Sequence, residues 1–508
     1  MWTESVGRLK KLGNSFVTYD GIIEMKWKST LILPTLILAL ASTYVHADKL
    51  TNKVDVYVKA QMEKSHIPGV SLAVVRDGKV VLAKGYGLAN VELSVPATRD
   101  TVYELLSVSK EFTAAAILLL VEEEKVSLGE TVPKYLPDSP AAWKDITVRH
   151  LLSHTSGITD YTDIRPFFEM IRQDASPEEL MKPVKERPLD FAAGTRWRYS
   201  NSNYFVLGLI LEKVSGKKYA DFLEERIFQP LGMMATRVND MTDIITNRAS
   251  GYHWLGEDHD KMPPFVSGYH GRKNVLQNAI YISPTRKWAA GAILSSVTDL
   301  IKWDAALQTG KLLKKSTVEQ MSTPTKLKSG VETDYGLGNE LSEARGHRLA
   351  GHQGGGMAFN TTLLRCVDDN LTVIVLTNQT SGPSKPMAIH IASLFVPGLS
   401  YEQGKGIEDK DPKITELLRG VLVDAQKGKA DASLFAPEAL QTADFIRRAG
   451  PNFLGTKGAL KSFVPLERRE EAARRVLIYR SVFGETSILW TFALDKEDKI
   501  LSLTPKEE

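Results

Sequence analysis

The sequence predicts an α/β domain with a largely helical insertion, followed by a small α+β domain. Three features lead to this prediction: strand-like runs at both ends of the large domain, helical patterns between them, and a linker-like stretch near residue 400. The chain has 508 residues, of which 43% are hydrophobic and 25% charged. This is ordinary globular composition, so a sizeable core is expected.

The large domain begins with a predicted hairpin, in which Asp77-Gly78 separates strand-like runs over residues 70–75 and 80–83. It ends with a further strand over residues 371–376 and a helix-like run over residues 387–395. The sheet is therefore expected to be assembled from both ends of the domain.

Helical patterns dominate the sequence between these terminal elements, for example over residues 112–121 and 204–214. The sheet would therefore carry a largely helical insertion. A cleft between the two layers is the natural place for a ligand site.

A second unit is predicted after residue 411. Residues 399–411 are charged and contain glycine, a composition typical of a linker. Residues 412–508 begin with helical patterning and close with strand-like runs over residues 475–483 and 487–494. We predict that this unit is an accessory, non-catalytic α+β domain.

Charge balance and cysteine content exclude several classes of protein. Lys and Arg number 64 and Asp and Glu 61, a net charge of +3 that provides no positive field for a phosphate backbone, so nucleic acid is not predicted as a partner. The single cysteine, Cys366, excludes an intramolecular disulfide framework, a four-cysteine zinc site and an iron–sulfur cluster. No metal or cofactor is predicted, and the chemistry is expected to use oxygen and nitrogen groups.

The N-terminal region has the pattern of an export signal. Lys26 and Lys28 precede an apolar run over residues 31–41, and small residues close the stretch. Residues 25–47 are therefore predicted to be a signal peptide, and residues 1–24 an upstream extension of the reading frame. The apolar run is shorter than the roughly 20 residues of a membrane-spanning helix, so cleavage is favoured over an uncleaved anchor. We expect an exported protein, periplasmic or secreted, with no stable membrane span after cleavage.

Ser107 and Lys110 form an S-x-x-K motif just before an apolar run, residues 112–121, that is typical of a buried helix. Residues i and i+3 of a helix lie roughly 5 to 6 Å apart at Cβ, so the amine can approach the hydroxyl. The helix N-terminus also favours negative charge at this position. The motif is weak alone, because Ser215 to Lys218 repeats it without a buried helix following, and a structural Ser–Lys pair is the alternative.

Two further motifs carry groups that suit catalysis. Tyr199-Ser200-Asn201 is a Y-x-N sequence that follows a turn-like stretch, and its alternatives are a half-buried aromatic residue and a helix cap. Residues 351–356 read Gly-His-Gln-Gly-Gly-Gly, in which glycines allow the backbone to approach a ligand; a plain glycine-rich turn is the alternative. The combination of all three motifs in this order is far more specific than any one of them.

This combination resembles the serine β-lactamase and penicillin-binding-protein superfamily, in particular its class C β-lactamase-like esterases and D-amino-acid peptidases. The resemblance covers about residues 52–398 and includes the loop Leu151-Leu152-Ser153-His154-Thr155-Ser156-Gly157, in which His154 is expected to hold a turn. It implies a β-lactamase-like fold, with an antiparallel sheet flanked by helices plus a mostly helical subdomain. It also implies serine hydrolase activity.

The resemblance implies that Ser107 is the acylated nucleophile and that Lys110 and Tyr199 share the roles of general base and general acid. It also implies that Asn201 orients the carbonyl side of the substrate. A serine hydroxyl needs a neighbouring base in its unprotonated form. The pKa of a lysine, near 10.4, must fall by about three units for this task, which burial and a cation such as protonated His352 could provide. Whether Lys110 or Tyr199 takes the first proton is left open by the sequence.

The third motif supplies the remaining predicted site residues. The oxyanion hole is expected to consist of the backbone N–H groups of Ser107 and Gly355. His352 and Gly354 are expected to line the substrate site together with Asn201. His352 takes the position of the lysine of the family's K-T-G motif, so a permanent positive charge for a substrate carboxylate is missing.

This departure shapes the predicted function. We expect an exported serine hydrolase that acts on small esters, amides or D-amino-acyl peptides, with efficient β-lactam hydrolysis in doubt. The alternatives are a D,D-peptidase or weak β-lactamase, and a catalytically idle ligand-binding or scaffold protein. The sequence makes no prediction of oligomeric state.

Overall fold

A computed structural model describes residues 49–165, 167–256, 274–396, 398–399, 406–470 and 474–507. Contacts divide the chain into residues 1–53 and 54–508, and only the helical residues 49–53 of the first unit are described. The predicted extension and signal peptide, residues 1–47, lie outside the described residues. Over the described ranges, every helix is too short or too polar to cross a bilayer.

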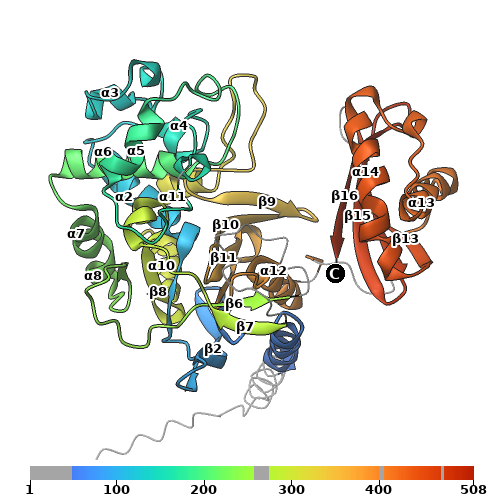
Figure 1. Cartoon of the computed structure of the whole chain (residues 1–508), viewed down its shortest axis with the longest axis horizontal. Helices are drawn as coiled ribbons and strands as arrows, with labels where there is room; N and C mark the ends of the chain where they lie inside the picture. Colours follow the sequence, from blue (N-terminus) through green and yellow to red (C-terminus); the bar gives the residue numbers. More distant parts are fainter. Residues whose placement is uncertain are drawn as a thin grey trace, which may run out of the picture. The chain divides into compact units, whose positions relative to one another are not determined.

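A seven-stranded antiparallel sheet forms the centre of the large domain, in the order β3-β2-β1-β12-β11-β10-β9 (Figure 1). The register pairs Val70 of β1 with Thr377 of β12, so the two ends of the domain meet in the middle of the sheet, as predicted. The predicted hairpin turn is also present, because Asp77 and Gly78 both have positive φ angles, 50° and 71°. The strands are β1 (Gly69–Arg76), β2 (Lys79–Asn90), β3 (Val95–Pro96), β9 (Glu340–Ala344), β10 (His347–Gly355), β11 (Asn360–Cys366) and β12 (Leu371–Thr377).

The central strand β12 is buried on both faces. Its sequence, LTVIVLT, is apolar or β-branched throughout, and all of its residues are buried. Ile374 and Leu376 belong to the main hydrophobic core, on the side of α10 (Val297–Thr309). Helix α12 (Ser384–Phe395) covers the other face of β11 and β12 (Figure 1). The sheet is thus sandwiched between helices.

The insertion between β1–β2 and β9–β12 is mostly helical, as predicted, although it also contains short strands. Its helices are α2 (Ser109–Glu122), α3 (Val132–Tyr135), α4 (Val148–Leu152), α5 (Pro177–Lys185), α6 (Asn201–Ser215), α7 (Tyr219–Leu223), α8 (Gln229–Leu231), α9 (Trp288–Gly291), α10 and α11 (Lys315–Met321). Its strands are β4 (Val102–Glu104), β5 (Arg237–Val238), β6 (Tyr252–Leu255), β7 (Val275–Asn278) and β8 (Ile293–Ser296).

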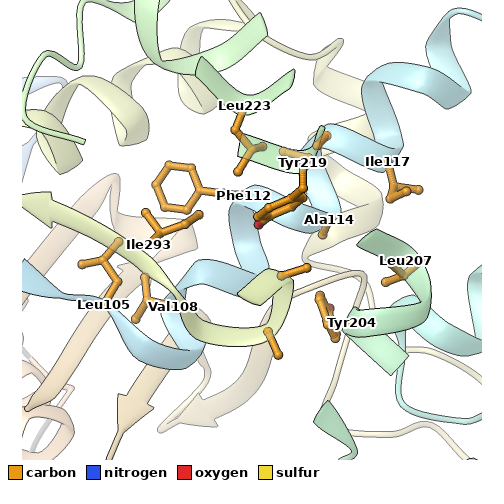
Figure 2. Packing of buried hydrophobic residues seen from close by; sticks show 14 of the residues in the cluster. Leu105, Val108, Phe112, Ala114, Ile117, Tyr204, Leu207, Tyr219, Leu223 and Ile293 are labelled. Carbon is orange, nitrogen blue, oxygen red and sulfur yellow. The ribbon is translucent and has the colours of Figure 1, made fainter. Parts of the chain in front are cut away.

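Helix α2 lies at the centre of the hydrophobic core, as its apolar sequence predicts. Residues 109–120 are all buried, and Phe112 stacks on Trp303 with ring centroids 4.1 Å apart. Phe112, Ala114 and Ile117 lie among the other buried side chains of the core (Figure 2). Burying one side chain of this size stabilises the fold by roughly 2 to 3 kcal/mol. A helix packed on every side cannot rotate or slide, so the residues at its first turn have fixed positions.

A buried ion cluster attaches α2 to the sheet. Arg365 of β11 donates to Asp304 Oδ1 at 2.7 Å and to Glu111 Oε2 at 3.1 Å. The side chains of Glu111 and Asp304 are 0% and 1% exposed. Both carboxylates therefore depend on one guanidinium, which fixes the helix that carries Lys110 against the strand next to β10.

The C-terminal segment has its own sheet and its own hydrophobic cluster. The strand order is β13-β14-β15-β16, and the cluster includes Trp490 and Phe492. The predicted strands over residues 475–483 and 487–494 correspond to β14 and β15, whereas β13 and β16 were not predicted. The elements are α13 (Pro412–Gln426), α14 (Leu440–Phe453), β13 (Leu460–Glu470), β14 (Arg475–Phe483), β15 (Thr486–Leu494) and β16 (Ile500–Glu507).

Candidate active site

Ser107 lies in a tight 3₁₀ turn, Leu106–Val108, that leads directly into α2. Leu106 has a positive φ angle of 52°, a left-handed conformation that is costly for a leucine. The turn is held by packing, since Leu105 and Val108 are fully buried in the core (Figure 2). Ser107 itself is only half-buried. A strained backbone conformation at Leu106 thus helps to fix the position of the Ser107 hydroxyl.

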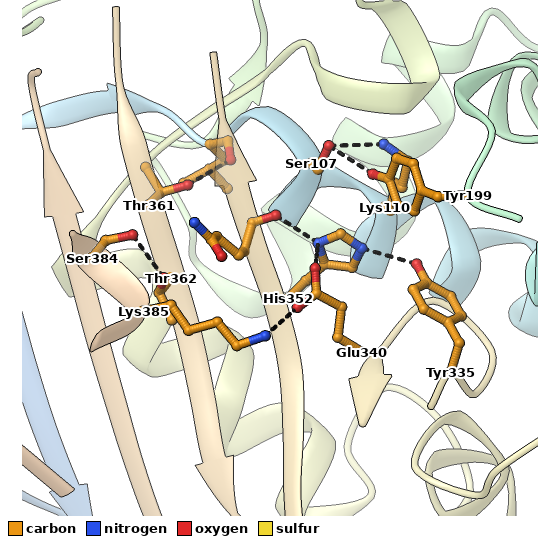
Figure 3. A network of polar contacts seen from close by, with 12 residues as sticks. Ser107, Lys110, Tyr199, Tyr335, Glu340, His352, Thr361, Thr362, Ser384 and Lys385 are labelled. Atoms are coloured by element: carbon orange, nitrogen blue, oxygen red, sulfur yellow. Dashed lines mark hydrogen bonds and ion pairs between the residues drawn. The ribbon is translucent and has the colours of Figure 1, made fainter. Parts of the chain in front are cut away.

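Lys110 and Tyr199 both point at the Ser107 hydroxyl (Figure 3). Lys110 Nζ lies 3.0 Å from Ser107 Oγ, and the Tyr199 hydroxyl donates to Ser107 Oγ at 2.8 Å. Ser107 and Tyr199 are 92 residues apart in the chain. The two motifs therefore meet within hydrogen-bond distance.

The remaining contacts of Lys110 orient its amine. Lys110 is 0% exposed, and Nζ donates to Asn201 Oδ1 and to the carbonyl oxygen of Ala290, both at 2.8 Å. These two oxygens can only accept, so they take two N–H groups in either charge state. In the neutral amine the lone pair is then left for the Ser107 hydroxyl. Burial lowers the pKa of Lys110 from 10.5 to about 7.

Tyr199 is kept as a phenol. Burial raises its pKa well above 10, so the hydroxyl remains a donor at neutral pH. The imidazole of His154 lies against the Tyr199 ring, with centroids 4.3 Å apart, and its Nδ1 accepts from the Ser200 backbone N–H at 3.2 Å. His154 is fully buried and has a positive φ angle of 58°. It holds the turn that positions Tyr199, in agreement with the structural role predicted for it.

The glycines of the third motif differ in their surroundings. A Cβ on Gly354 would lie 2.1 Å from the carbonyl oxygen of Leu105, so only glycine lets β10 pack against the turn that carries Ser107. A Cβ on Gly355 would meet its nearest neighbour, an atom of Asn360, at 3.8 Å. Gly354 therefore packs closely against the turn that carries Ser107, and Gly355 is the position with open space beside it.

His352 differs from the expectation that it supplies a cation. It is 2% exposed, its Nε2 lies 2.9 Å from the Tyr335 hydroxyl, and its Nδ1 lies 2.7 Å from the carbonyl oxygen of Gln353 (Figure 3). Burial lowers the pKa of His352 to about 4, although the neighbouring Glu340 opposes this shift. The imidazole is therefore neutral near pH 7. Burial, rather than a protonated His352, accounts for the lowered pKa of Lys110.

Asn201 contacts the protein with both ends of its amide. Its Oδ1 accepts from Lys110, while its Nδ2 and its backbone N–H each donate to Asp160 Oδ2 at 2.9 Å. Asp160 lies outside the three sequence motifs. Its position in the sequence could have pointed to it, because Asp160 follows three residues after Gly157, which ends the loop over residues 151–157 that resembles the family.

The second S-x-x-K sequence lies apart from this cluster. Ser215 is the last residue of α6, and Gly216 follows in the left-handed conformation, with φ of 69°, that commonly ends helices. Ser215 and Lys218 thus flank a helix terminus, and only the motif at Ser107 opens a buried helix.

Residues 54–394 match the Beta-lactamase family, and the chain belongs to that family. The sheet flanked by helices is the β-lactamase-like fold predicted from the sequence. The chain is thus a serine hydrolase of the β-lactamase and penicillin-binding-protein group.

Several curated relatives are about 30% identical to the chain over the aligned residues. Penicillin-binding protein 4* of Bacillus subtilis is 30% identical over 368 residues, which cover 69% of this chain and 77% of the relative. D-aminopeptidase of Brucella anthropi is 29% identical over 346 residues, which cover 66% of this chain and 61% of the relative. The match therefore spans less than two thirds of that enzyme.

Solved structures show the same fold. The octameric penicillin-binding protein homologue from Pyrococcus abyssi is 25% identical, with a TM-score of 0.58, over 90% of this chain and 96% of that one. D-amino acid amidase from Ochrobactrum anthropi SV3, complexed with L-phenylalanine amide, is 26% identical, with a TM-score of 0.57. The match covers 65% of this chain and 92% of the amidase chain.

Proposed function

We propose that the chain forms an acyl-enzyme at Ser107 and hydrolyses small esters or peptide-like amides, D-amino-acyl amides among them. The observation that carries this proposal is the convergence of Lys110 Nζ and the Tyr199 hydroxyl on Ser107 Oγ, at 3.0 and 2.8 Å. A serine flanked by a base and a separate proton donor is the arrangement that nucleophilic acyl transfer needs. A purely structural serine needs neither.

Lys110 acts as the base in the acylation step. With a pKa of about 7 a large fraction of its amine is neutral near pH 7, whereas Tyr199 is held as a phenol. Ser107 Oγ attacks the substrate carbonyl carbon while its proton passes to Lys110 Nζ. As the tetrahedral intermediate collapses, the bond to the leaving group breaks and the leaving nitrogen or oxygen takes a proton delivered through Tyr199 and Lys110.

Hydrolysis of the acyl-enzyme uses the same groups in reverse. A water molecule attacks the ester carbonyl and loses a proton to the Lys110–Tyr199 pair, and Ser107 Oγ leaves with a proton. The backbone N–H groups of Ser107 and Gly355 are the proposed donors to the oxyanion in both steps. Gly355 suits this role because it belongs to β10, which packs directly on the Ser107 turn through Gly354.

The motif at residues 351–356 carries an uncharged His352, and it therefore favours substrates without a free carboxylate next to the scissile bond. His352 is uncharged near pH 7, and the nearby Lys385 ammonium is paired with Glu340 at 2.7 Å. A β-lactam or a D,D-peptide carries a carboxylate that would meet little positive charge here. The D-amino acid amidase among the solved structures is named for an amide substrate, which fits this expectation.

Export and the division into domains belong to the same proposal. The signal-like segment at residues 25–47 supports an exported enzyme, periplasmic or secreted. The separate hydrophobic cluster of the C-terminal segment supports an accessory domain over residues 412–508 that does not take part in the chemistry. The linker assigned to residues 399–411 is described in part only.

The test is covalent labelling of the full chain with a fluorophosphonate, followed by mapping of the adduct by mass spectrometry, with Ser107→Ala as the control. We expect one adduct on Ser107 and none in the variant. Folded protein without an adduct would contradict the proposal and favour the ligand-binding alternative.

A substrate panel separates the remaining alternatives. We expect hydrolysis of p-nitrophenyl acetate and of D-alanyl amides, with slow or absent turnover of nitrocefin. Fast nitrocefin turnover, or a preference for D-alanyl-D-alanine peptides over D-alanyl amides, would instead indicate a β-lactamase or a D,D-peptidase.

A further inference from the structure

We propose that Asp160 is a positioning residue of this site: its carboxylate fixes the orientation of the Asn201 amide and thereby aims the Lys110 amine at Ser107. Asp160 touches neither Ser107 nor the reacting atoms in the described contacts, so its effect passes through Asn201. The inference rests on the proposed acyl-enzyme chemistry at Ser107.

The carboxylate of Asp160 is fully used by its neighbours. Asp160 is 6% exposed, and its Oδ2 accepts from the backbone N–H and from Nδ2 of Asn201, both at 2.9 Å. Its Oδ1 accepts from the backbone N–H and the hydroxyl of Thr162, both at 3.0 Å. Four donors on two oxygens hold this side chain in one rotamer.

This arrangement decides which end of the Asn201 amide faces Lys110. An asparagine amide can turn by half a rotation and exchange its oxygen and nitrogen. Here Nδ2 is held by a carboxylate, which only accepts, so Oδ1 must face Lys110. If the amide turned, Nδ2 would compete for the lone pair of Lys110, and the amine could no longer serve Ser107 as a base.

The charge of Asp160 has a second effect. Asn201 is the first residue of α6, so the carboxylate lies at the positive end of that helix. Burial lowers the pKa of Lys110, and the charges of Asp160 and Glu340 oppose this shift. The other titratable groups that face Lys110 are the phenols of Tyr199 and Tyr204 and the imidazoles of His154 and His352.

Two substitutions separate the hydrogen bonds of Asp160 from its charge. In Asp160→Asn the amide oxygen can still accept from both Asn201 donors when the amide nitrogen takes the place of the oxygen that accepts from Thr162. The orientation of Asn201 is then kept, whereas the charge and the contacts with Thr162 are lost. Asp160→Ala loses the charge and all of these hydrogen bonds. We expect Asp160→Ala to slow fluorophosphonate labelling of Ser107 by roughly 10- to 100-fold, as expected for losing charge-assisted hydrogen bonds, and Asp160→Asn to retain most of the wild-type maximal rate.

A double-mutant cycle tests whether the effect passes through Asn201. We expect Asp160→Ala combined with Asn201→Ala to label no more slowly than Asn201→Ala alone. Multiplying losses in the double variant would show that Asp160 acts independently of Asn201, and would overturn the proposal.

The pH profile of labelling provides a readout that a purely structural residue would not change. The negative charge of Asp160 stabilises protonated Lys110, so its removal favours the neutral amine. We expect the acid limb of the Asp160→Asn profile to move to lower pH. Asp163→Asn is the matched control, because Asp163 is 55% exposed and paired with Arg198, and its profile should match the wild type.

The outcomes distinguish the two proposals. The role of Asp160 would be refuted if the wild type is labelled at Ser107, the pH profile of Asp160→Asn matches that of the wild type, and the labelling rate of Asp160→Ala is unchanged. The acyl-enzyme proposal would survive that result. Wild-type protein that does not label would refute the acyl-enzyme itself. If Asp160→Ala fails to fold by circular dichroism, the Asp160→Asn profile decides.

Discussion

Replacing Lys110 with methionine is expected to remove activity and also a specific pH dependence of stability. The side chain of methionine fills a similar volume without an amine, so the substitution tests the cost of burying that amine. The pKa of Lys110 is about 7 in the folded protein against 10.5 for an exposed lysine. The unfolded chain therefore binds more protons between about pH 7 and 10.5, and the free energy of unfolding of the wild type rises with pH through that window.

The size of the effect follows from the two pKa values. Between pH 6 and pH 9, linkage predicts that Lys110 adds about 3 kcal/mol to the free energy of unfolding of the wild type, relative to a variant without the amine. Below pH 6 the contribution becomes constant, because Lys110 is then protonated in both states. The variant should consequently be most stabilised, relative to the wild type, on the acid side.

The assay is urea unfolding of wild-type and Lys110→Met protein at pH 6 and pH 9, followed by tryptophan fluorescence. The quantity of interest is the change with pH in the difference between the two proteins. Lys213→Met, which removes an exposed lysine of α6, is the matched control and should follow the wild type. Identical pH dependences of wild type and Lys110→Met would refute the claim that Lys110 is strongly desolvated.

Three further substitutions test other parts of the site. Tyr199→Phe removes the proton donor to Ser107 and is expected to slow labelling by roughly 100-fold or more with the fold intact by circular dichroism; an unchanged rate would remove Tyr199 from the mechanism. Gly354→Ala is expected to lower both the melting temperature and the labelling rate, whereas Gly355→Ala should fold normally, because only the first places a Cβ 2.1 Å from a backbone oxygen. Arg365→Met leaves two buried carboxylates without their cation and is expected to destabilise the protein by about 3 to 5 kcal/mol in urea titrations; a loss below about 1 kcal/mol would contradict that assignment.

Local patterns predicted the elements whose signals are short-range. The hairpin around Asp77-Gly78 follows from a two-residue turn between two strand-like runs, and α2 follows from an uninterrupted apolar run. Strands β13 and β16 were missed because each contains a proline and charged residues, Pro465 in β13 and Pro505 in β16. These strands are the edges of their sheet, where unpaired backbone groups tolerate such residues.

The sequence patterns did not predict the charge states of the residues in the site. The motif at His352 suggested a cation near Lys110, yet the imidazole is buried against the Tyr335 hydroxyl and its pKa is about 4. The contacts of Asn201 likewise depend on Asp160, whose place beside α6 results from a loop folding back over 41 residues of sequence. Burial and pairing are properties of the assembled core, and a linear pattern does not contain them.

The amino-acid order by itself determined the candidate nucleophile, since a serine three residues before a lysine at the start of a buried helix places both on one face whatever surrounds them. It also determined the central sheet and the family. Only the tertiary structure decided the charge state and the orientation of Lys110. Its pKa depends on exclusion of water, and the direction of its amine depends on acceptors contributed by Asn201 and Ala290, 91 and 180 residues away in the chain.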